Sequence, residues 1–170
     1  NLCTEIMLPS NDNWSFVCVL SSINLLNFEK WKDTDAVETM VYFLDAVITE
    51  FLEKLEHYKL SPDRDDQQTF LFMERAYNFA KENRALGLGV LGWHSLLQSR
   101  MLPFGSQEAF DLNSQIFNLI QKKSYKASEE LAKKFGEPSL LEGYGRRNAT
   151  LNAIAPTTSS AFILGQVSQG

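Results

Sequence analysis

The sequence predicts a helix-rich α/β fold. Three long stretches in residues 33–136 carry apolar residues at helical spacing, and short apolar segments rich in Val, Ile and Leu lie around them. Short apolar strands that alternate with amphipathic helices are typical of α/β layering. The strands are too few to close a sheet, so we expect these 170 residues to be a piece of a longer polypeptide.

The first elements are short and extended. Residues 2–8 read as a strand or extended entry that breaks at Pro9, and residues 15–26, rich in Val, Ile, Leu and Phe, hold a second strand. A helix then opens at Asp35, where Glu38 three residues later forms a capping pattern. This helix should end before Pro62.

The following elements alternate in the same way. We predict a helix over 66–83, a glycine-dotted apolar strand within 84–92, a helix over 93–101 and a long helix over 106–135 that stops at Gly136. Residues 148–155 read as a strand, 156–160 as a turn, and 161–167 as an apolar segment. The faces that we expect to be buried comprise Val37, Met40, Val41, Leu44, Val47, Ile48, Phe51, Leu52 and Leu55, then Phe70, Met73, Tyr77 and Ala80, then Phe110, Ile116, Phe117, Ile120 and Leu131.

The composition excludes several classes of protein. Hydrophobic residues make up 44% and charged residues 22%, which excludes wholesale disorder, and a net charge of −5 argues against a dedicated nucleic-acid binder. No apolar run reaches the ~18–20 residues that span a bilayer, so we expect no membrane partner. The two cysteines, Cys3 and Cys18, are too few for a disulfide scaffold and lack the spacing of zinc ligands. A reducing, cytoplasmic location fits them best.

The string Asn1-x-Cys3-x-Glu5 is the first candidate site. In an extended segment alternate side chains share one face, so an amide, a thiol and a carboxylate would project together. These groups suit orientation of a substrate, radical or nucleophilic chemistry at sulfur, and proton transfer. The alternative is an edge strand whose polar residues face water, with Cys3 as a small buried side chain.

Cys18 is the second candidate. Its neighbours in Phe16-Val-Cys-Val-Leu20 favour an inert thiol in the core, and that alternative stays open. If the second strand lies beside the first, Cys18 comes near Cys3. Two cysteines near one site indicate redox chemistry, or one radical sulfur with a separate reductant.

Two further strings concern anions. The turn 156–160 follows a predicted strand and precedes an apolar segment, so its N–H groups and hydroxyls suit a phosphate; ordinary capping of a helix is the alternative. Gly87, Gly89 and Gly92 match a dinucleotide-binding string literally, but the polar stretch before them is no hydrophobic strand. Glycines in a strand more often permit close approach of another backbone.

Four segments together resemble the large catalytic subunit of ribonucleotide reductases, of the class I or class II type. They are Asn1-Leu-Cys-Thr-Glu-Ile6, the segment 16–25, Arg84-Ala-Leu-Gly-Leu-Gly-Val-Leu-Gly92, and residues 147–160 with Pro-Thr-Thr-Ser-Ser at their end. The resemblance implies a partial ten-stranded α/β barrel and one catalytic domain. Residues 1–8 would be its finger loop, 33–136 its helical middle, and 148–162 a strand with a phosphate-binding turn.

The resemblance also implies roles for single residues. Cys3 would become a thiyl radical that takes the 3′ hydrogen of a ribonucleotide, Glu5 would act as base toward the 3′ hydroxyl, and Asn1 would hydrogen-bond the ribose hydroxyls. Cys18 would be one half of the dithiol that reduces the sugar, its partner cysteine lying upstream of Asn1. The substrate's phosphates would lie on Pro156, Thr157, Thr158, Ser159 and Ser160.

The cofactors and partners follow from the same resemblance. We expect this segment to bind no metal, and the radical to come from a dimetal small subunit in class I or from adenosylcobalamin in class II. A thioredoxin or glutaredoxin would return the electrons, and ATP or deoxynucleotide effectors would bind regions outside this segment. Two alternatives stay open: a non-catalytic helical assembly module of a split enzyme, and a hydrolase that uses Cys3 with His94. We expect the segment alone to be inactive.

Overall fold

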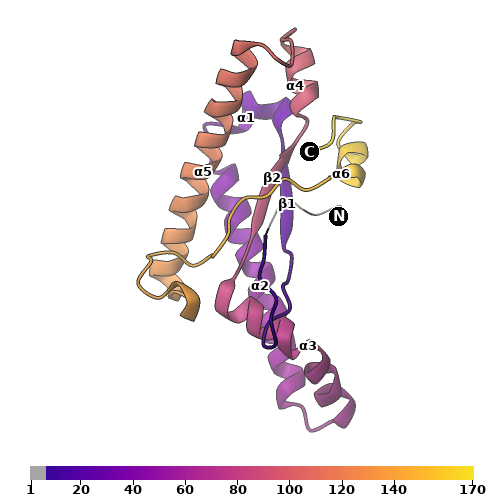
Figure 1. Ribbon diagram of the computed structural model, residues 1–170, viewed down its shortest axis with the longest axis vertical. Helices are drawn as coiled ribbons and strands as arrows, with labels where there is room; N and C mark the ends of the chain where they lie inside the picture. The colour runs from indigo at the N-terminus through magenta and orange to yellow at the C-terminus, as the bar shows by residue number, and fades with distance from the viewer. Residues whose placement is uncertain (1–6) are drawn as a thin grey trace.

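Two short parallel strands lie at the centre of the computed structural model, which describes residues 7–170 (Figure 1). β1 (Leu20–Asn24) pairs with β2 (Gly87–Leu91), in a register that runs from Leu20 opposite Gly87 to Asn24 opposite Leu91. Parallel strands need a long crossover connection, which helices supply here. The remaining elements are η1 (Leu25–Asn27), α1 (Phe28–Trp31), α2 (Ala36–Leu60), α3 (Arg64–Asn83), α4 (Trp93–Ser99), α5 (Gln107–Phe135), η2 (Ser139–Leu141) and α6 (Thr158–Ile163).

The long helices are confirmed. α2 ends at Leu60, as Pro62 requires, and α3 begins two residues before its predicted start. Asp63 begins α3 by accepting a hydrogen bond from the Asp65 N–H at 2.7 Å, and Ser106 begins α5 by accepting one from Ala109 N–H at 3.1 Å. Side-chain oxygens at these positions satisfy N–H groups that the helix itself leaves unpaired.

The capping pattern predicted at Asp35 is wrong. Its side chain accepts no capping bond, and the Ala36 N–H donates instead to Thr34 Oγ1 at 3.3 Å. Glu38, the other half of that pattern, lies 3.4 Å from the Lys123 ammonium of α5. An ion pair between helices has therefore replaced the expected local hydrogen bonds.

The main core lies between the two strands, α2 and α5. β2, α2 and α5 supply buried residues to it, and β1 supplies the half-buried Ile23. A smaller cluster of Leu55, Phe70 and Tyr77 joins the far ends of α2 and α3. Three residues expected inside are exposed: Val47 by 38%, Met73 by 37% and Phe110 by 65%. Their sequence spacing marks a broad apolar stripe, but the neighbouring elements cover only part of its width. The buried side chains of the main core include Leu25, Phe28, Val37, Val41, Leu44, Ile48, Leu86, Leu88, Leu97, Ile116 and Ile120.

Around β1 the prediction holds only in part, because the strand covers just the end of the apolar stretch 15–26. Asn24 ends it: its side-chain oxygen accepts from the Leu26 N–H at 2.9 Å and starts the η1 turn. The indole N–H of Trp31 donates to the Asn24 carbonyl at 3.0 Å, which holds α1 against the strand end. Neither η1 nor α1 was expected from the sequence.

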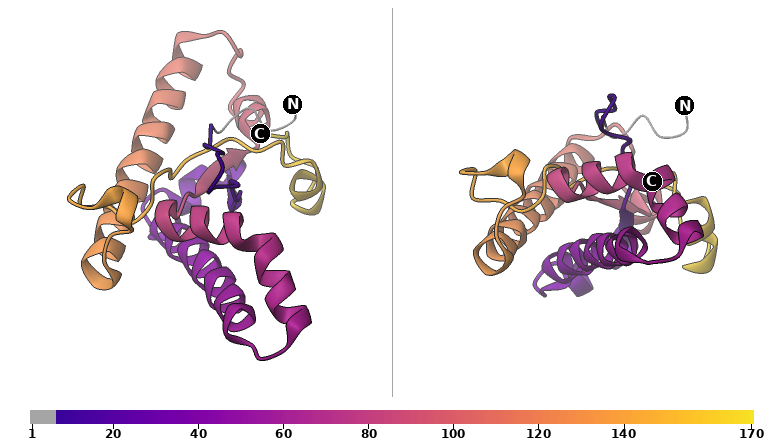
Figure 2. Two further views of the ribbon diagram at one scale, coloured as in Figure 1. Left: turned by 60° about the horizontal axis from the view of Figure 1, so that its bottom comes forward. Right: turned by 90° about the horizontal axis from the view of Figure 1, so that it is seen from below.

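Residues 149–155 run along the other side of β2 as an irregular third chain. The Leu88 N–H donates to the Leu151 carbonyl at 2.8 Å, and the Ala153 N–H donates to the Leu88 carbonyl at 3.3 Å. This segment forms a single parallel β-bridge, between Leu88 and Asn152. The regular strand predicted over 148–155 is therefore wrong. Figure 2 shows this chain crossing beside the strands toward α6, while α2 and α3 form a hairpin that extends away from them.

None of the helices in residues 7–170 combines the length and the apolar character that crossing a bilayer requires.

Candidate functional site

The predicted catalytic residues Asn1, Cys3 and Glu5 lie outside the described residues. Their common face therefore stays a prediction. The structure does describe Cys18 and the turn 156–160.

Cys18 lies two residues before the start of β1, and its side chain is exposed. Its neighbours Val17 and Val19 are half-buried and pack against the main core. Alternate residues of an extended chain point to opposite faces, so Cys18 faces away from that core. The alternative of an inert thiol in the core is wrong, and the sulfur is placed where another molecule can reach it.

The turn 156–160 overlaps the start of α6. Thr157 has a left-handed backbone, with φ of 57°, and makes no side-chain capping bond to the helix. Its hydroxyl instead accepts from the Gly170 N–H at 2.9 Å, and the Thr158 hydroxyl donates to Gln169 Oε1 at 3.0 Å. The alternative of ordinary capping by Thr or Ser is thus wrong. The side chains of Ser159 and Ser160 are exposed.

β2 brings this turn into place through its glycines. An ideal Cβ on Gly89 would lie well inside contact distance of the Ala153 carbonyl oxygen and 3.2 Å from the Cα of Ile154. The glycine therefore lets residues 149–155 pack directly on the strand, as the sequence predicts. Gly87 and Gly89 lie within β2 rather than in a turn before a helix, which is not the arrangement of a dinucleotide site. The turn follows the carboxyl-terminal end of the third parallel chain, where ligands bind in α/β sheets.

A buried ion cluster that the sequence pattern did not predict joins α2 and the end of α3 to the residues just before the 149–155 segment. Asp45 of α2 is 3% exposed. Its carboxylate accepts from Arg84 Nε at 2.8 Å, from Arg147 Nε at 3.0 Å and from Asn148 Nδ2 at 2.9 Å. Arg84 also donates to the hydroxyl of Thr49 at 2.6 Å. We refer to Asp45, Arg84, Arg147 and Asn148 as the Asp45 cluster.

The positive charges in this cluster offset the effect of burial on the pKa of Asp45. Burial by itself raises the pKa of Asp45, but the hydrogen bond from Arg84 and the positive charges of Arg84 and Arg147 outweigh it and hold the pKa below the ordinary value of 3.8. Asp45 is therefore ionised at neutral pH. Its position could have been noticed, since it lies on the apolar face of α2 between Val41 and Ile48, where a charge needs partners.

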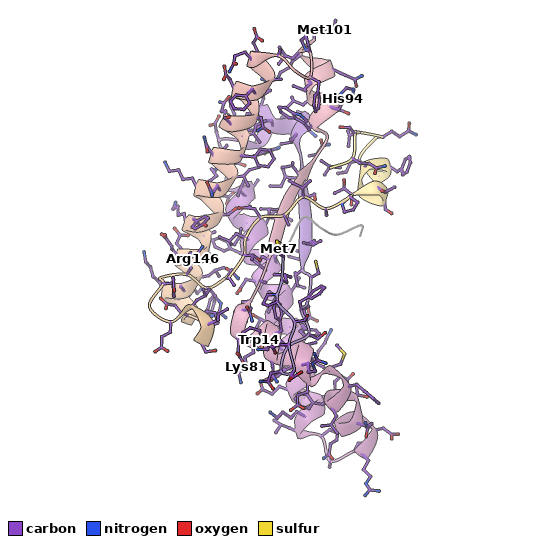
Figure 3. All side chains as sticks on the ribbon, in the orientation of Figure 1. Met7, Trp14, Lys81, His94, Met101 and Arg146 are labelled. Carbon is purple, nitrogen blue, oxygen red and sulfur yellow. The ribbon has the colours of Figure 1, made fainter. Side chains whose placement is uncertain are left out.

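The two histidines are surface residues. His57 is exposed beside Tyr58, with ring centres 6.1 Å apart, and His94 is exposed beside Phe104 at 6.5 Å. Figure 3 shows His94 at the α4 end of the molecule, far from Met7. Within residues 7–170 no group of three or more His, Cys, Asp and Glu side chains is placed to hold a metal ion.

The comparisons with known proteins all lead to ribonucleotide reductases. The family model described as "Ribonucleotide reductase, barrel domain" matches residues 1–144. A putative ribonucleoside-diphosphate reductase large subunit of Frog virus 3 is 41% identical over 97% of this chain and 27% of its own length. The ribonucleoside-diphosphate reductase large subunit of Invertebrate iridescent virus 6 is 38% identical over 98% of this chain and 16% of its own length. A vitamin B12-dependent ribonucleoside-diphosphate reductase of Thermoplasma acidophilum is 29% identical over 87% of this chain and 19% of its own length.

Solved structures agree. The Actinobacillus ureae class Id ribonucleotide reductase alpha subunit superposes with a TM-score of 0.87 at 56% sequence identity, over 100% of this chain and 30% of its own. The chain spans less than a third of each of these proteins. Its helix-rich fold with two parallel strands is a part of their barrel, which confirms the predicted fold class. The chain thus belongs to the ribonucleotide reductase large-subunit family, as a segment of the barrel domain.

Proposed function

We propose that this chain carries the radical cysteine and part of the substrate site of a ribonucleoside-diphosphate reductase, which makes deoxyribonucleotides for DNA synthesis. Membership of the large-subunit family supports the reaction. The viral and archaeal relatives are named as reductases of ribonucleoside diphosphates, which supports diphosphates as substrates. Residues 1–8, 33–136 and 148–162 would be the finger loop, the helical middle and the strand with its phosphate turn within one catalytic domain.

The reaction would begin at Cys3. Its thiyl radical takes the hydrogen atom from C3′ of the ribose, which forms an S–H bond and leaves a carbon radical. Glu5 accepts the proton of the 3′ hydroxyl, and the electron density released there helps the 2′ hydroxyl to leave. Asn1 holds the ribose hydroxyls in place by hydrogen bonds. This step needs all three groups on one face of an extended segment.

Cys18 would supply the electrons together with a second cysteine from outside this segment. The two thiols give two electrons and two protons, the 2′ oxygen leaves as water, and the sulfurs join as a disulfide. Cys3 then returns its hydrogen atom to C3′, which restores the thiyl radical. A thioredoxin- or glutaredoxin-type dithiol then reduces that disulfide for the next turnover. The exposed position of Cys18 before β1 supports this role, because both the substrate and a second thiol must reach it.

The turn 156–160 would hold the substrate's phosphates. α6 has only six residues, so we assign the contact to the first backbone N–H groups and the exposed hydroxyls of Ser159 and Ser160 rather than to a helix dipole. Cys18 precedes β1, whereas the turn follows the carboxyl-terminal end of the chain beside β2. A nucleotide that contacts both would lie along the strands, its sugar toward Cys18 and its phosphates toward the turn.

The radical would come from outside this segment. The described residues include no cluster that could hold a metal ion. The relatives include both a class Id and a vitamin B12-dependent enzyme, so a dimetal small subunit and adenosylcobalamin are the two candidate sources. Either one would supply an oxidising equivalent to the sulfur of Cys3.

The family match across Asn1, Cys3 and Glu5 carries this proposal, and a pair of serine variants tests it. In the full-length enzyme with its radical source and a dithiol reductant, we expect Cys3→Ser to abolish both deoxyribonucleotide formation and cleavage of a 3′ carbon–tritium bond. Cys18→Ser should abolish the product but still cleave the 3′ bond, since the radical step precedes reduction. Unchanged turnover by Cys3→Ser would overturn the proposal and favour the non-catalytic assembly module.

A further inference from the structure

Asn148 marks the point where the chain leaves the helical part and approaches β2. It is 0% exposed. Its side-chain NH2 donates to Asp45 Oδ1 at 2.9 Å and to the Arg84 carbonyl at 3.0 Å, and its side-chain oxygen accepts from the Ser128 hydroxyl at 2.8 Å. The Asn148 backbone N–H donates to the same hydroxyl at 3.1 Å. Both N–H donors of the amide and its oxygen are therefore used.

The partners of Asn148 come from three helices. Asp45 belongs to α2, Arg84 ends α3, and Ser128 belongs to α5. Arg147, the preceding residue, is fixed as well, because its guanidinium bonds Asp45 at 3.0 Å and the Gly136 carbonyl at 2.8 Å. Such directed bonds in a dry interior hold one backbone position more sharply than apolar packing does.

The chain takes its register on β2 directly after this anchor. The Ala149 N–H donates to the Asn83 carbonyl at 3.0 Å, and the Leu86 N–H donates to the Thr150 carbonyl at 3.0 Å. Leu151 and Ala153 then face inward, 4% and 5% exposed. A slip of one residue would exchange inward and outward side chains along an extended segment. It would also move the following turn along the strands.

We propose that Asn148, held by Asp45, is a positioning residue that sets the register of residues 149–155 on β2 and thereby places the 156–160 turn for the substrate's phosphates. This inference rests on the proposed function. Asn148 does not touch the substrate; it acts through the seven residues 149–155, which pair with β2. The Asp45 cluster would then serve binding of the nucleotide rather than only the stability of the barrel.

The test compares Asn148→Ala with Leu55→Ala in the full-length enzyme. Leu55 is also buried but belongs to the separate cluster at the far end of α2 and α3, so it controls for general loss of stability. Ser128→Ala removes the two hydrogen bonds between Ser128 and Asn148 but leaves those to Asp45 and Arg84, so it is the second variant if Asn148→Ala does not fold. The measurements are KM and kcat for a ribonucleoside diphosphate, its Kd by calorimetry, and hydrogen exchange of the Leu86, Leu88 and Ala153 amides.

We expect Asn148→Ala to raise the KM and the Kd about ten- to a hundredfold, because displaced binding groups carry penalties of this order. Exchange at Leu88 and Ala153 should rise with it, while kcat at saturation changes less. Leu55→Ala should leave KM and Kd unchanged. Faster exchange with an unchanged KM and Kd would overturn the positioning role, as would an equal rise in Leu55→Ala. Failure of the wild-type enzyme to reduce the nucleotide, with its Kd still raised in Asn148→Ala, would overturn the reaction and leave the positioning role standing.

Discussion

A methyl group on Gly89 should dislodge the chain that carries the substrate turn. The Cβ of Gly89→Ala would fall inside the 3.0 Å limit of real Cβ contacts to the Ala153 carbonyl oxygen, 3.1 Å from its carbon and 3.2 Å from Ile154 Cα. These are backbone atoms, so no side chain can rotate away. Residues 149–155 must therefore withdraw from β2.

The cost can be worked out from the contacts that this movement breaks. The Leu88 N–H and the Ala153 N–H lose their partners across the gap, at about 1–3 kcal/mol for buried groups left unsatisfied. Overpacking adds about 1–3 kcal/mol. Together the segment should lose about 2–6 kcal/mol of local stability. Since 1.4 kcal/mol corresponds to tenfold in an equilibrium, its amides should exchange about thirty- to ten-thousandfold faster.

Hydrogen exchange with mass spectrometry on the full-length protein measures this change, in peptides that cover 86–91 and 149–155. Gly105→Ala is the matched control, because a Cβ there meets nothing within 4 Å. It carries the same change in backbone entropy without the clash. Wild-type exchange in Gly89→Ala would refute the claim that close packing on β2 places this chain.

Three further changes test other parts of the structure. The pKa of Asp45 is depressed in the folded state, so the stabilisation by Arg84 and Arg147 should be present above pH ~4 and fade as the pH falls through the lowered value. In thermal unfolding, Asp45→Asn should lack this acid-dependent loss of stability. Ser106→Ala should lower the stability of the α5 amino terminus by ~1 kcal/mol, seen as faster exchange in its first turn only. Ile116→Ala, at a fully buried site, should cost about 2–5 kcal/mol in denaturant unfolding, and a loss below ~1 kcal/mol would contradict the described core.

The sequence predicts the helices well because their signals are local. Asp63, Ser106 and Gly136 mark helix ends within a few residues of the groups that they bond. The strand over 148–155 is different, since its pairing depends on how closely Gly87 and Gly89 of β2 let it approach. Its apolar pattern predicts an extended chain correctly but not that only one bridge forms.

The same contrast between local and long-range signals applies to the functional residues. Asn1, Cys3 and Glu5 form a short local pattern, so a single segment suffices to propose a site. The Asp45 cluster could not be predicted in this way, because Arg84 and Arg147 lie 39 and 102 positions beyond Asp45. A charge on an apolar helix face indicates that partners exist, but only the fold identifies them.

The outward position of Cys18 also needed the structure. Its apolar neighbours favour a buried thiol equally well, and the pattern alone left that open. The half-buried Val17 and Val19 on either side show which face of the chain is covered. Burial on one face of an extended segment is thus what separates an accessible sulfur from a packed one.

A structure of the full-length enzyme with a bound ribonucleoside diphosphate tests the central claim most directly. We predict that the Cys3 sulfur lies in contact with C3′ of the ribose and that the phosphates accept hydrogen bonds from residues of the 156–160 turn. A nucleotide bound with its ribose away from Cys3, or with its phosphates on other residues, would contradict the account.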